Sequence, residues 1–371
     1  MMTLDQCLED MVAHEASDLF ITVGMPASAK INGQLSPLTA MPLSEADALD
    51  LVHQAMTPAQ QASFLSEREC NFAIARDGIG RFRCSAFWQR DQAGMVVRRI
   101  VTQIPEADDL GLPDVLKDII MSKKGLVLFV GGTGTGKSTS LAALIGHRNE
   151  HSFGHILTIE DPIEFVHEHR NCVVTQREVG IDTHSFDHAL KSSLRQAPDV
   201  ILIGEIRSME TMEYAMSFAD TGHLCVATLH ANNANQAIER IMHLAPRESH
   251  DKLRFDLSLN IRAIVAQQLV PTVDGKGRVA AIEILLNSPL IKDLIQRNEI
   301  GSLKEAMVKG KESGMQTFDM ALYNLYRAGK ITQEQALHNS DSPNDLRLMI
   351  KLDSEAGTGL GSLSEVSIDM D

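Results

Sequence analysis

The residues best suited to chemistry lie in Gly131-Gly-Thr-Gly-Thr-Gly-Lys-Ser-Thr139, directly after the apolar run 126–130. Residues 131–138 fit the phosphate-loop pattern G-x-x-x-x-G-K-[ST]. Glycines let backbone N–H groups close around phosphate oxygens, and the following helix presents its positive end. The strand before and the amphipathic helix after disfavour the alternative of a simple glycine turn. The residues expected to bind ATP are Gly132, Thr133, Gly134, Thr135, Gly136, Lys137, Ser138 and Thr139, with Ser138 also a ligand of Mg²⁺.

Glu205 ends the apolar run 200–203, where its carboxylate could serve a bound metal ion. Transfer of a phosphoryl group to water needs one group that holds the metal and one that orients the attacking water. We expect Glu205 beside the phosphate loop, on the metal side and acting through a water. A solvated glutamate at the end of a strand is the alternative.

A second acidic group lies in Thr158-Ile-Glu-Asp-Pro-Ile-Glu-Phe165, after the run 155–159. A carboxylate at the end of a neighbouring parallel strand can accept hydrogen bonds from water and aim it at the γ-phosphate. Glu164 is the residue we expect in that role, with Glu160 and Asp161 shaping the electrostatic field. Taken alone, three acids after a strand are more typical of a polar turn.

Histidine and arginine residues would complete such a site. His230 follows the run 224–229, from where it could donate a hydrogen bond to the γ-phosphate, although a structural histidine is the alternative. Arg83 alternates with Arg81 on one predicted strand, and Arg98 lies on its presumed partner. In a ring, this domain could place Arg81, Arg83, Arg98 and Arg99 over a neighbour's ATP as trans-acting fingers. A solvated strand face fits them equally well.

Composition excludes several other classes. The chain has 371 residues, 44% of them hydrophobic, and a formal net charge of -15. Acidity disfavours a nucleic-acid partner, and neither a secretory signal nor a membrane-spanning run is recognisable. We therefore expect a cytoplasmic protein. The five cysteines form no C-x-x-C pair, which argues against a disulfide framework or a tetracysteine zinc site.

Two domains must position these groups. Residues 1–103 mix short alternating runs with helical spacing, as in a small α+β domain, and 104–113 break periodicity with two prolines and a glycine, as in a linker. Residues 114–340 carry continuous apolar runs separated by helix-length segments, which predict an α/β fold with a parallel sheet. The acidic segment 341–371 is expected to be largely disordered.

These motifs resemble the Walker A, Asp box, Walker B and His box of secretion-superfamily hexameric ATPases. Within that superfamily the chain resembles the PilT/PilU family of type IV pilus retraction ATPases, and Ala16-Ser-Asp-Leu-Phe-Ile-Thr-Val-Gly-Met-Pro26 extends the likeness to the N-terminus. The resemblance implies a PAS-like first domain and a RecA-like P-loop core. It also implies that Glu164 is the catalytic glutamate, Glu205 the Walker B glutamate, and His230 the His-box histidine. The inter-subunit arginines that it implies are Arg83 and Arg98.

Further consequences of the resemblance concern partners. It implies a homohexamer at the inner face of the inner membrane, working with a PilT-like ATPase and a membrane platform protein. The segment Pro289-Leu-Ile-Lys-Asp-Leu-Ile-Gln-Arg-Asn-Glu299 differs from the Ala-Ile-Arg-Asn-Leu-Ile-Arg-Glu motif of PilT, and Ala197 replaces its usual Asp. Both departures favour the accessory PilU branch. The alternatives are a nucleic-acid translocase and a regulatory ring component that binds ATP.

Overall fold

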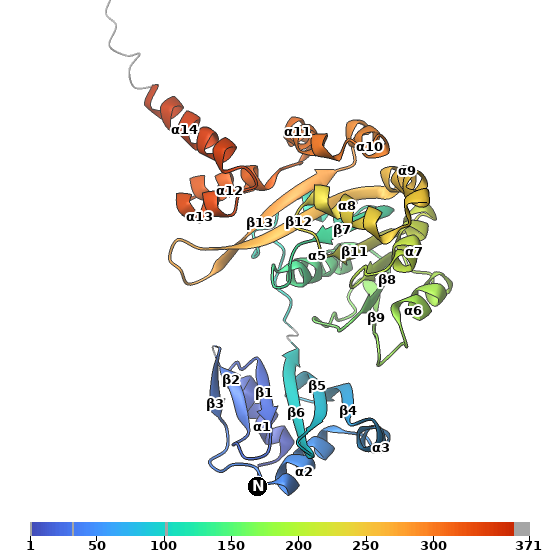
Figure 1. Cartoon of the computed structure of the whole chain (residues 1–371), viewed down its shortest axis with the longest axis vertical. Coiled ribbons are helices and arrows are strands. Elements are labelled where there is room, and N and C mark those ends of the chain that lie inside the picture. Colours follow the sequence, from blue (N-terminus) through green and yellow to red (C-terminus); the bar gives the residue numbers. More distant parts are fainter. Residues whose placement is uncertain (1, 32, 101–102, 360–371) are drawn as a thin grey trace, which may run out of the picture. The chain divides into compact units, whose positions relative to one another are not determined.

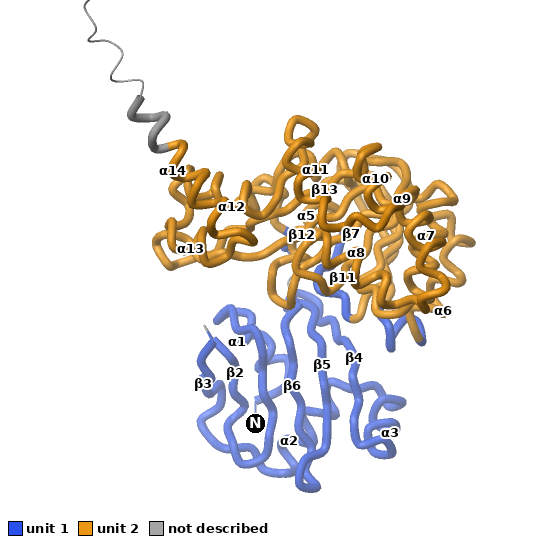
Figure 2. The backbone as a smooth tube through the Cα atoms, turned by 45° about the horizontal axis from the view of Figure 1, so that its top comes forward, with its two compact units in different colours: residues 1–104, 162–167, 178–184 blue, residues 105–161, 168–177, 185–371 orange. Residues whose placement is uncertain are grey.

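A computed structural model of the protein describes residues 2–31, 33–100 and 103–359, in two compact units (Figures 1 and 2). The first unit comprises Met1–Ile104 with Pro162–His167 and Glu178–His184. The second unit comprises Pro105–Asp161, Glu168–Arg177 and Ser185–Asp371. Each unit has its own buried apolar cluster.

The first unit is an antiparallel sheet in the order β3-β2-β1-β6-β5-β4, with helices packed on one face. In α2, four apolar side chains are buried at helical spacing and Ser44 caps the start. The elements are α1 (Leu4–Ala13), β1 (Asp18–Ile21), β2 (Ser28–Ile31), β3 (Gln34–Pro37), α2 (Glu45–Ala55), α3 (Pro58–Glu67), β4 (Glu69–Arg76), β5 (Gly80–Gln89) and β6 (Gln92–Ile100).

Strands β5 and β6 form the predicted pair, joined by a two-residue turn. Arg90 and Asp91 both have positive φ, 48° and 61°, as a tight hairpin turn requires. Alternation along β5 turns Phe82 and Cys84 into the core. Arg81 and Arg83 therefore lie on the opposite face of the sheet.

The second unit contains a seven-stranded sheet in the order β13-β12-β7-β11-β10-β8-β9. The four apolar runs form β7, β8, β10 and β11, which pair in parallel as predicted. The strands are β7 (Gly125–Val130), β8 (Gly154–Glu160), β9 (Cys172–Glu178), β10 (Val200–Ile203), β11 (Leu224–Leu229), β12 (Ile261–Pro271) and β13 (Arg278–Leu286). The α-helices are α4 (Val115–Ile120), α5 (Lys137–His151), α6 (Phe186–Ser193), α7 (Met209–Asp220), α8 (Ala234–Leu244), α9 (His250–Asn260), α10 (Pro289–Gln296), α11 (Leu303–Lys309), α12 (Phe318–Arg327), α13 (Gln333–His338) and α14 (Pro343–Gly359).

The order of the strands sets how far the strand of each candidate residue lies from the phosphate loop. Strand β11, which leads to His230, is hydrogen-bonded directly to β7 along its whole length. Strand β10, which leads to Glu205, lies one position further, and β8 follows it. His230 thus follows the strand next to the phosphate loop, and Glu205 follows the strand after that one.

The predicted linker and the predicted disordered tail also differ from the structure. Residues 103–113 form no helix or strand, but Ala107 and Leu112 are buried in the core of the second unit. Most of the linker is therefore part of that unit.

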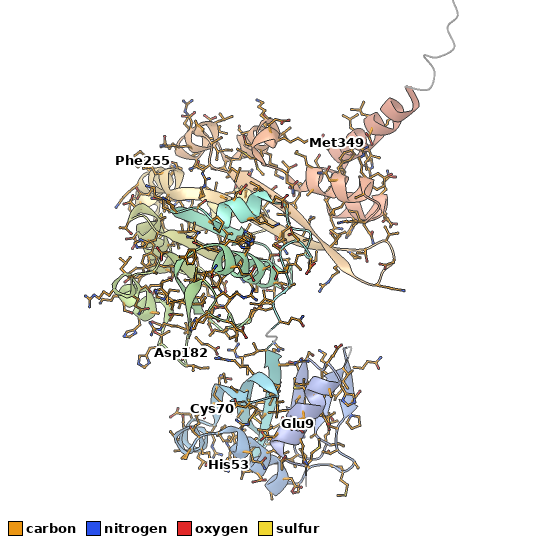
Figure 3. The ribbon with its side chains drawn as sticks, turned by 180° about the vertical axis from the view of Figure 1, so that it is seen from behind. Glu9, His53, Cys70, Asp182, Phe255 and Met349 are labelled. Atoms are coloured by element: carbon orange, nitrogen blue, oxygen red, sulfur yellow. The ribbon has the colours of Figure 1, made fainter. Side chains whose placement is uncertain are left out.

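In the tail, α14 is helical over Pro343–Gly359, with Leu346 fully buried, so the expectation of disorder is wrong there. Residues 360–371 lie outside the described residues. Figure 3 shows Phe255 on α9 and Met349 on α14.

Ala197 has a strained backbone that predicts a stabilising substitution. It follows the 3₁₀ turn Leu194–Gln196 with φ 50° and ψ 51°, in the left-handed region. That region costs an alanine about 1 kcal/mol, whereas glycine enters it freely and aspartate is better tolerated. We expect Ala197→Gly and Ala197→Asp to raise the free energy of unfolding by about 0.5–1 kcal/mol. Urea unfolding would measure the change. Ala197→Val should be destabilising, and a gain with valine would refute the argument.

Candidate active site

The phosphate loop runs from the end of β7 to Lys137, the first residue of α5. Gly131 and Gly136 have φ of 153° and 85°, which side chains larger than hydrogen rarely allow. A Cβ on Gly131 would lie 2.6 Å from the carbonyl oxygen of Gln267, and one on Gly136 would lie 2.8 Å from Nε2 of the same residue. Thr135 Oγ1 donates to the Gly132 carbonyl at 2.9 Å. The loop is thus a closed cradle of backbone amides at a helix N-terminus, the geometry that binds phosphate.

Polar side chains hold the cradle in shape. Lys137 Nζ donates to the carbonyl oxygens of Gly131 and Gly132, at 2.8 and 2.7 Å. Gln267 Nε2 donates to the Thr135 carbonyl at 3.0 Å. Gln267 lies on β12, which pairs with β7, and sequence reasoning missed it because 132 positions separate the two residues. The loop is braced from the neighbouring strand as well as by its own lysine.

A cavity of about 940 Å³ opens beside the start of α5. Its wall includes Gly136 and Thr139 of the loop and helix, Leu269 and Arg278 of the β12–β13 hairpin, and Asp108. The volume is in the range of small-molecule and cofactor sites. The cavity could therefore accept the nucleoside of a nucleotide whose phosphates lie on the loop.

Three strand ends meet in one charged cluster. His230 Nε2 lies 3.1 Å from Glu205 Oε1, and Arg207 contacts Glu205 Oε2 at 2.7 Å. Arg207 Nη1 also lies 3.6 Å from Asp161 Oδ2. The hydrogen bond to Glu205 raises the pKa of Arg207, while burial acts in the opposite direction. The cluster joins the ends of β8, β10 and β11.

The predicted acids divide between different surroundings. The Glu160 carboxylate accepts hydrogen bonds from Thr158 at 2.6 Å and from Gln176 at 3.2 Å, both within the second unit. Glu164 is exposed and belongs to the segment Pro162–His167 of the first unit. Its role toward water therefore stays a prediction. Arg207 completes the cluster, and its place two residues after Glu205 already put it near the site in the sequence.

Arg83 and Arg98 face each other across the β5–β6 pair in the first unit. Arg98 Nε donates to Asp18 Oδ1 at 2.8 Å, and the Asp18 side chain is only 9% exposed. Ser17 Oγ donates to Asp18 Oδ2 at 2.8 Å. Burial acts to raise the pKa of Asp18, but the hydrogen bonds from Arg98 and Ser17 outweigh it and the net pKa is lowered. Asp18 fixes the direction in which Arg98 points.

The lowered pKa of Asp18 makes a pH-dependent prediction. Its ionised form stabilises the folded first unit above the unfolded pKa, and this contribution is lost as pH falls through the lower folded pKa. Asp18→Asn should therefore lower the free energy of unfolding by about 1–2 kcal/mol at pH 7. This value takes into account that solvent screens the exposed Arg98. In strong acid the variant and the unsubstituted protein should have nearly the same free energy of unfolding. Urea unfolding at several pH values would measure it, and a cost that stays constant down to pH 2 would contradict the assignment.

The residues present fit Mg²⁺ bound together with a nucleotide. Among the described residues no group of three or more His, Cys, Asp or Glu could hold a metal ion. Mg²⁺ is commonly held by one or two protein ligands together with phosphate oxygens and water. The Ser138 hydroxyl and the Glu205 carboxylate suit that pattern. In the part of the chain that the structure describes, no helix has the length and hydropathy to cross a membrane.

Comparison with known proteins places this site in a family. The profile of the type II/IV secretion system protein family matches residues 1–312. The chain belongs to this family. It is 59% identical to the type IV pilus ATPase PilU of Pseudomonas aeruginosa, over 98% of this chain and 96% of that protein. It is 38% identical to the type IV pilus retraction ATPase PilT of the same organism, over 93% of this chain and 100% of PilT.

Solved structures of the secretion ATPase family confirm the predicted fold. The crystal structure of the pilus retraction motor PilT with bound ADP matches with a TM-score of 0.87 and 37% identity, over 94% of this chain and 99% of that one. The ATPase DotB of Legionella pneumophila matches with a TM-score of 0.73 and 29% identity, over 90% and 94%. A RecA-like P-loop core preceded by an N-terminal α+β domain is therefore the architecture of this chain.

Proposed function

We propose that this chain is an ATPase that powers or assists type IV pilus retraction, as an accessory motor of the PilU type. The main support is the 59% identity to PilU over nearly the whole of both chains. A formed phosphate loop and the Glu205–His230 contact accompany it. A regulatory ring component that only binds ATP would not need a water-positioning glutamate.

In the proposed mechanism, loop amides and Lys137 hold the β- and γ-phosphates, while the cavity beside α5 takes the nucleoside. Ser138 and, through a water, Glu205 would hold Mg²⁺, which would supply charge neutralisation at the phosphates. Glu164 accepts hydrogen bonds from the attacking water and aligns it with the phosphorus. His230 donates a hydrogen bond to the γ-phosphate. After hydrolysis His230 loses that partner, and its contact with Glu205 changes in response.

The proposed assembly is a homohexamer in which Arg83 and Arg98 of one protomer act on the nucleotide of the next. Asp18 holds Arg98, so that this residue is presented in a fixed direction. Partners would be a PilT-like ATPase and the platform protein of the inner membrane, and the chain would associate with the membrane surface through them.

Retraction in cells tests this function. In a piliated strain that lacks this chain, retraction events would be counted after the PilT-like ATPase has been inactivated at its own water-positioning glutamate. Reintroducing this chain should restore retraction, and reintroducing the Glu164→Gln variant at the same level should not. Equal restoration by both variants would show that this chain does not contribute hydrolysis to retraction.

A further inference from the structure

Glu283 on β13 is a buried acid to which no role has been given so far. The residue is 1% exposed. Its Oε1 accepts a hydrogen bond from the backbone N–H of Ala234 at 2.8 Å. Within the described residues, Oε2 makes no hydrogen bond of standard geometry, and the Phe318 N–H is a weaker second donor toward the carboxylate. A buried carboxyl group with an incompletely paired oxygen costs stability, so its presence calls for a compensating role.

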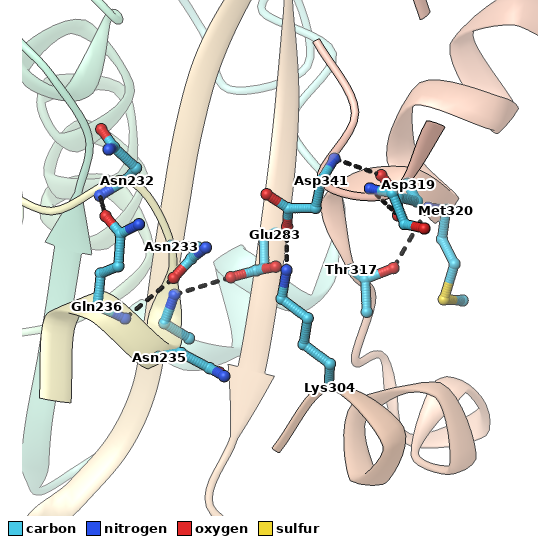
Figure 4. A network of polar contacts seen from close by, with 12 residues as sticks. Asn232, Asn233, Asn235, Gln236, Glu283, Lys304, Thr317, Asp319, Met320 and Asp341 are labelled. Carbon is cyan, nitrogen blue, oxygen red and sulfur yellow. Dashed lines mark hydrogen bonds and ion pairs between the residues drawn. The ribbon is translucent and has the colours of Figure 1, made fainter. Parts of the chain in front are cut away.

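Through this hydrogen bond, Glu283 binds Ala234, the first residue of α8. Two local hydrogen bonds shape this helix start, and two bonds anchor it to the rest of the unit. Figure 4 shows the two local bonds and the anchoring bond to Glu283. The local bonds run from Asn232 N to Gln236 Oε1 at 3.2 Å and from Gln236 N to Asn233 Oδ1 at 3.0 Å. The anchoring bonds run from Ala234 N to Glu283 Oε1 and from Asn235 Nδ2 to the Ile300 carbonyl at 2.9 Å. Glu283 is the charged member of this set.

The anchored segment directly follows His230. Residues 231–233 connect the end of β11, with His230, to the start of α8 at Ala234. A connection this short transmits any displacement of the helix start to His230. The contact of His230 Nε2 with Glu205 Oε1 at 3.1 Å depends on that placement.

We propose that Glu283 is a positioning residue for His230, which it acts on by fixing the N-terminus of α8. The proposal rests on the function proposed for His230 at the γ-phosphate. Glu283 itself touches neither nucleotide nor water in this account. It sets the position from which His230 reaches both Glu205 and the phosphate.

The charge on Glu283 makes this positioning sensitive to pH. Burial raises the pKa of Glu283 to about 7, and the field of Asp341 adds to the rise, whereas the N–H groups of Ala234 and Phe318 and the Lys304 ammonium oppose it. Lys304 on α11 is ion-paired with Asp341, whose N–H donates to Asp319 Oδ1 of α12 at 2.8 Å. The ionised carboxylate is the better partner for a helix N-terminus. Turnover should therefore rise with pH through neutrality.

A double-mutant cycle on kcat tests the coupling. Glu283→Ala should lower kcat about tenfold while KM for ATP stays within about twofold, because the lost placement acts on the reacting phosphate and not on binding. In a His230→Ala background, Glu283→Ala should lower kcat by about twofold or less. A tenfold cost in both backgrounds would overturn the proposal and leave the role of His230 intact. No effect of His230→Ala alone would instead remove the role proposed for His230, and the positioning role with it.

The pH profile of kcat gives a second test, which does not require the alanine variant to fold. Glu283→Gln keeps an acceptor for Ala234 and should remove the step in kcat near neutral pH. Lys304→Met should move the midpoint of that step to higher pH, and Asp341→Asn should move it to lower pH, following the directions in which each group shifts the pKa of Glu283. Thermal melting of each variant would confirm folding. An unchanged step in Glu283→Gln would overturn the proposal.

Discussion

Replacing Glu164 with Gln should lower steady-state ATP hydrolysis by about 10²–10⁴-fold, with nucleotide affinity changed by about twofold or less. The amide matches the carboxylate in shape but is a far weaker hydrogen-bond acceptor for water and cannot take its proton. Because Glu164 is exposed, the substitution should leave folding unaffected. Phosphate release and the binding of a fluorescent ATP analogue would measure the two effects separately.

Glu160→Gln is the matched control for that experiment. Glu160 lies four positions earlier and already accepts hydrogen bonds from Thr158 and Gln176, which an amide oxygen can also accept. Its replacement should reduce turnover far less. If Glu164→Gln kept normal turnover while Glu160→Gln abolished it, the water-positioning role would belong to Glu160.

Gly131→Ala should destabilise the second unit by about 2–4 kcal/mol and weaken nucleotide binding by about tenfold or more. The new Cβ would lie 2.6 Å from the Gln267 carbonyl oxygen and 2.7 Å from Thr135 Oγ1, at a φ of 153°. Either the loop or β12 must move, and both support the phosphate cradle. Urea unfolding and nucleotide titration would measure the two effects.

The neighbouring Gly132→Ala separates this steric effect from the general loss of a glycine. A Cβ at Gly132 meets only Thr135 Cγ2, at 3.9 Å, and Gly132 does not have a positive φ. Its stability should change by about 0.5 kcal/mol or less. Equal losses of stability in both variants would show that the contact with Gln267 is unimportant.

Local patterns predicted the elements that carry the site. Continuous apolar runs identified the four parallel strands, because strands buried on both faces leave a signal within a few residues. The phosphate loop was recognisable because glycine and lysine at fixed spacing determine its chemistry. The strand pair β5–β6 followed from its alternation.

Long-range placement could not be read in the same way. The position of β11 between β7 and β10 depends on how helices cross over the sheet, which no short segment encodes. The support of the loop by Gln267 and of α8 by Glu283 comes from the β12–β13 hairpin, far away in the sequence. The tail was misjudged because its acidic composition concealed the buried Leu346, which packs α14.

Steady-state phosphate release by the purified, sized protein tests the central claim most directly. It would be measured at saturating ATP and Mg²⁺, with and without single-stranded DNA. The account predicts turnover by this chain alone that DNA leaves unchanged. ATP binding without turnover would contradict it in favour of a regulatory ring component, and turnover that requires DNA would contradict it in favour of a translocase.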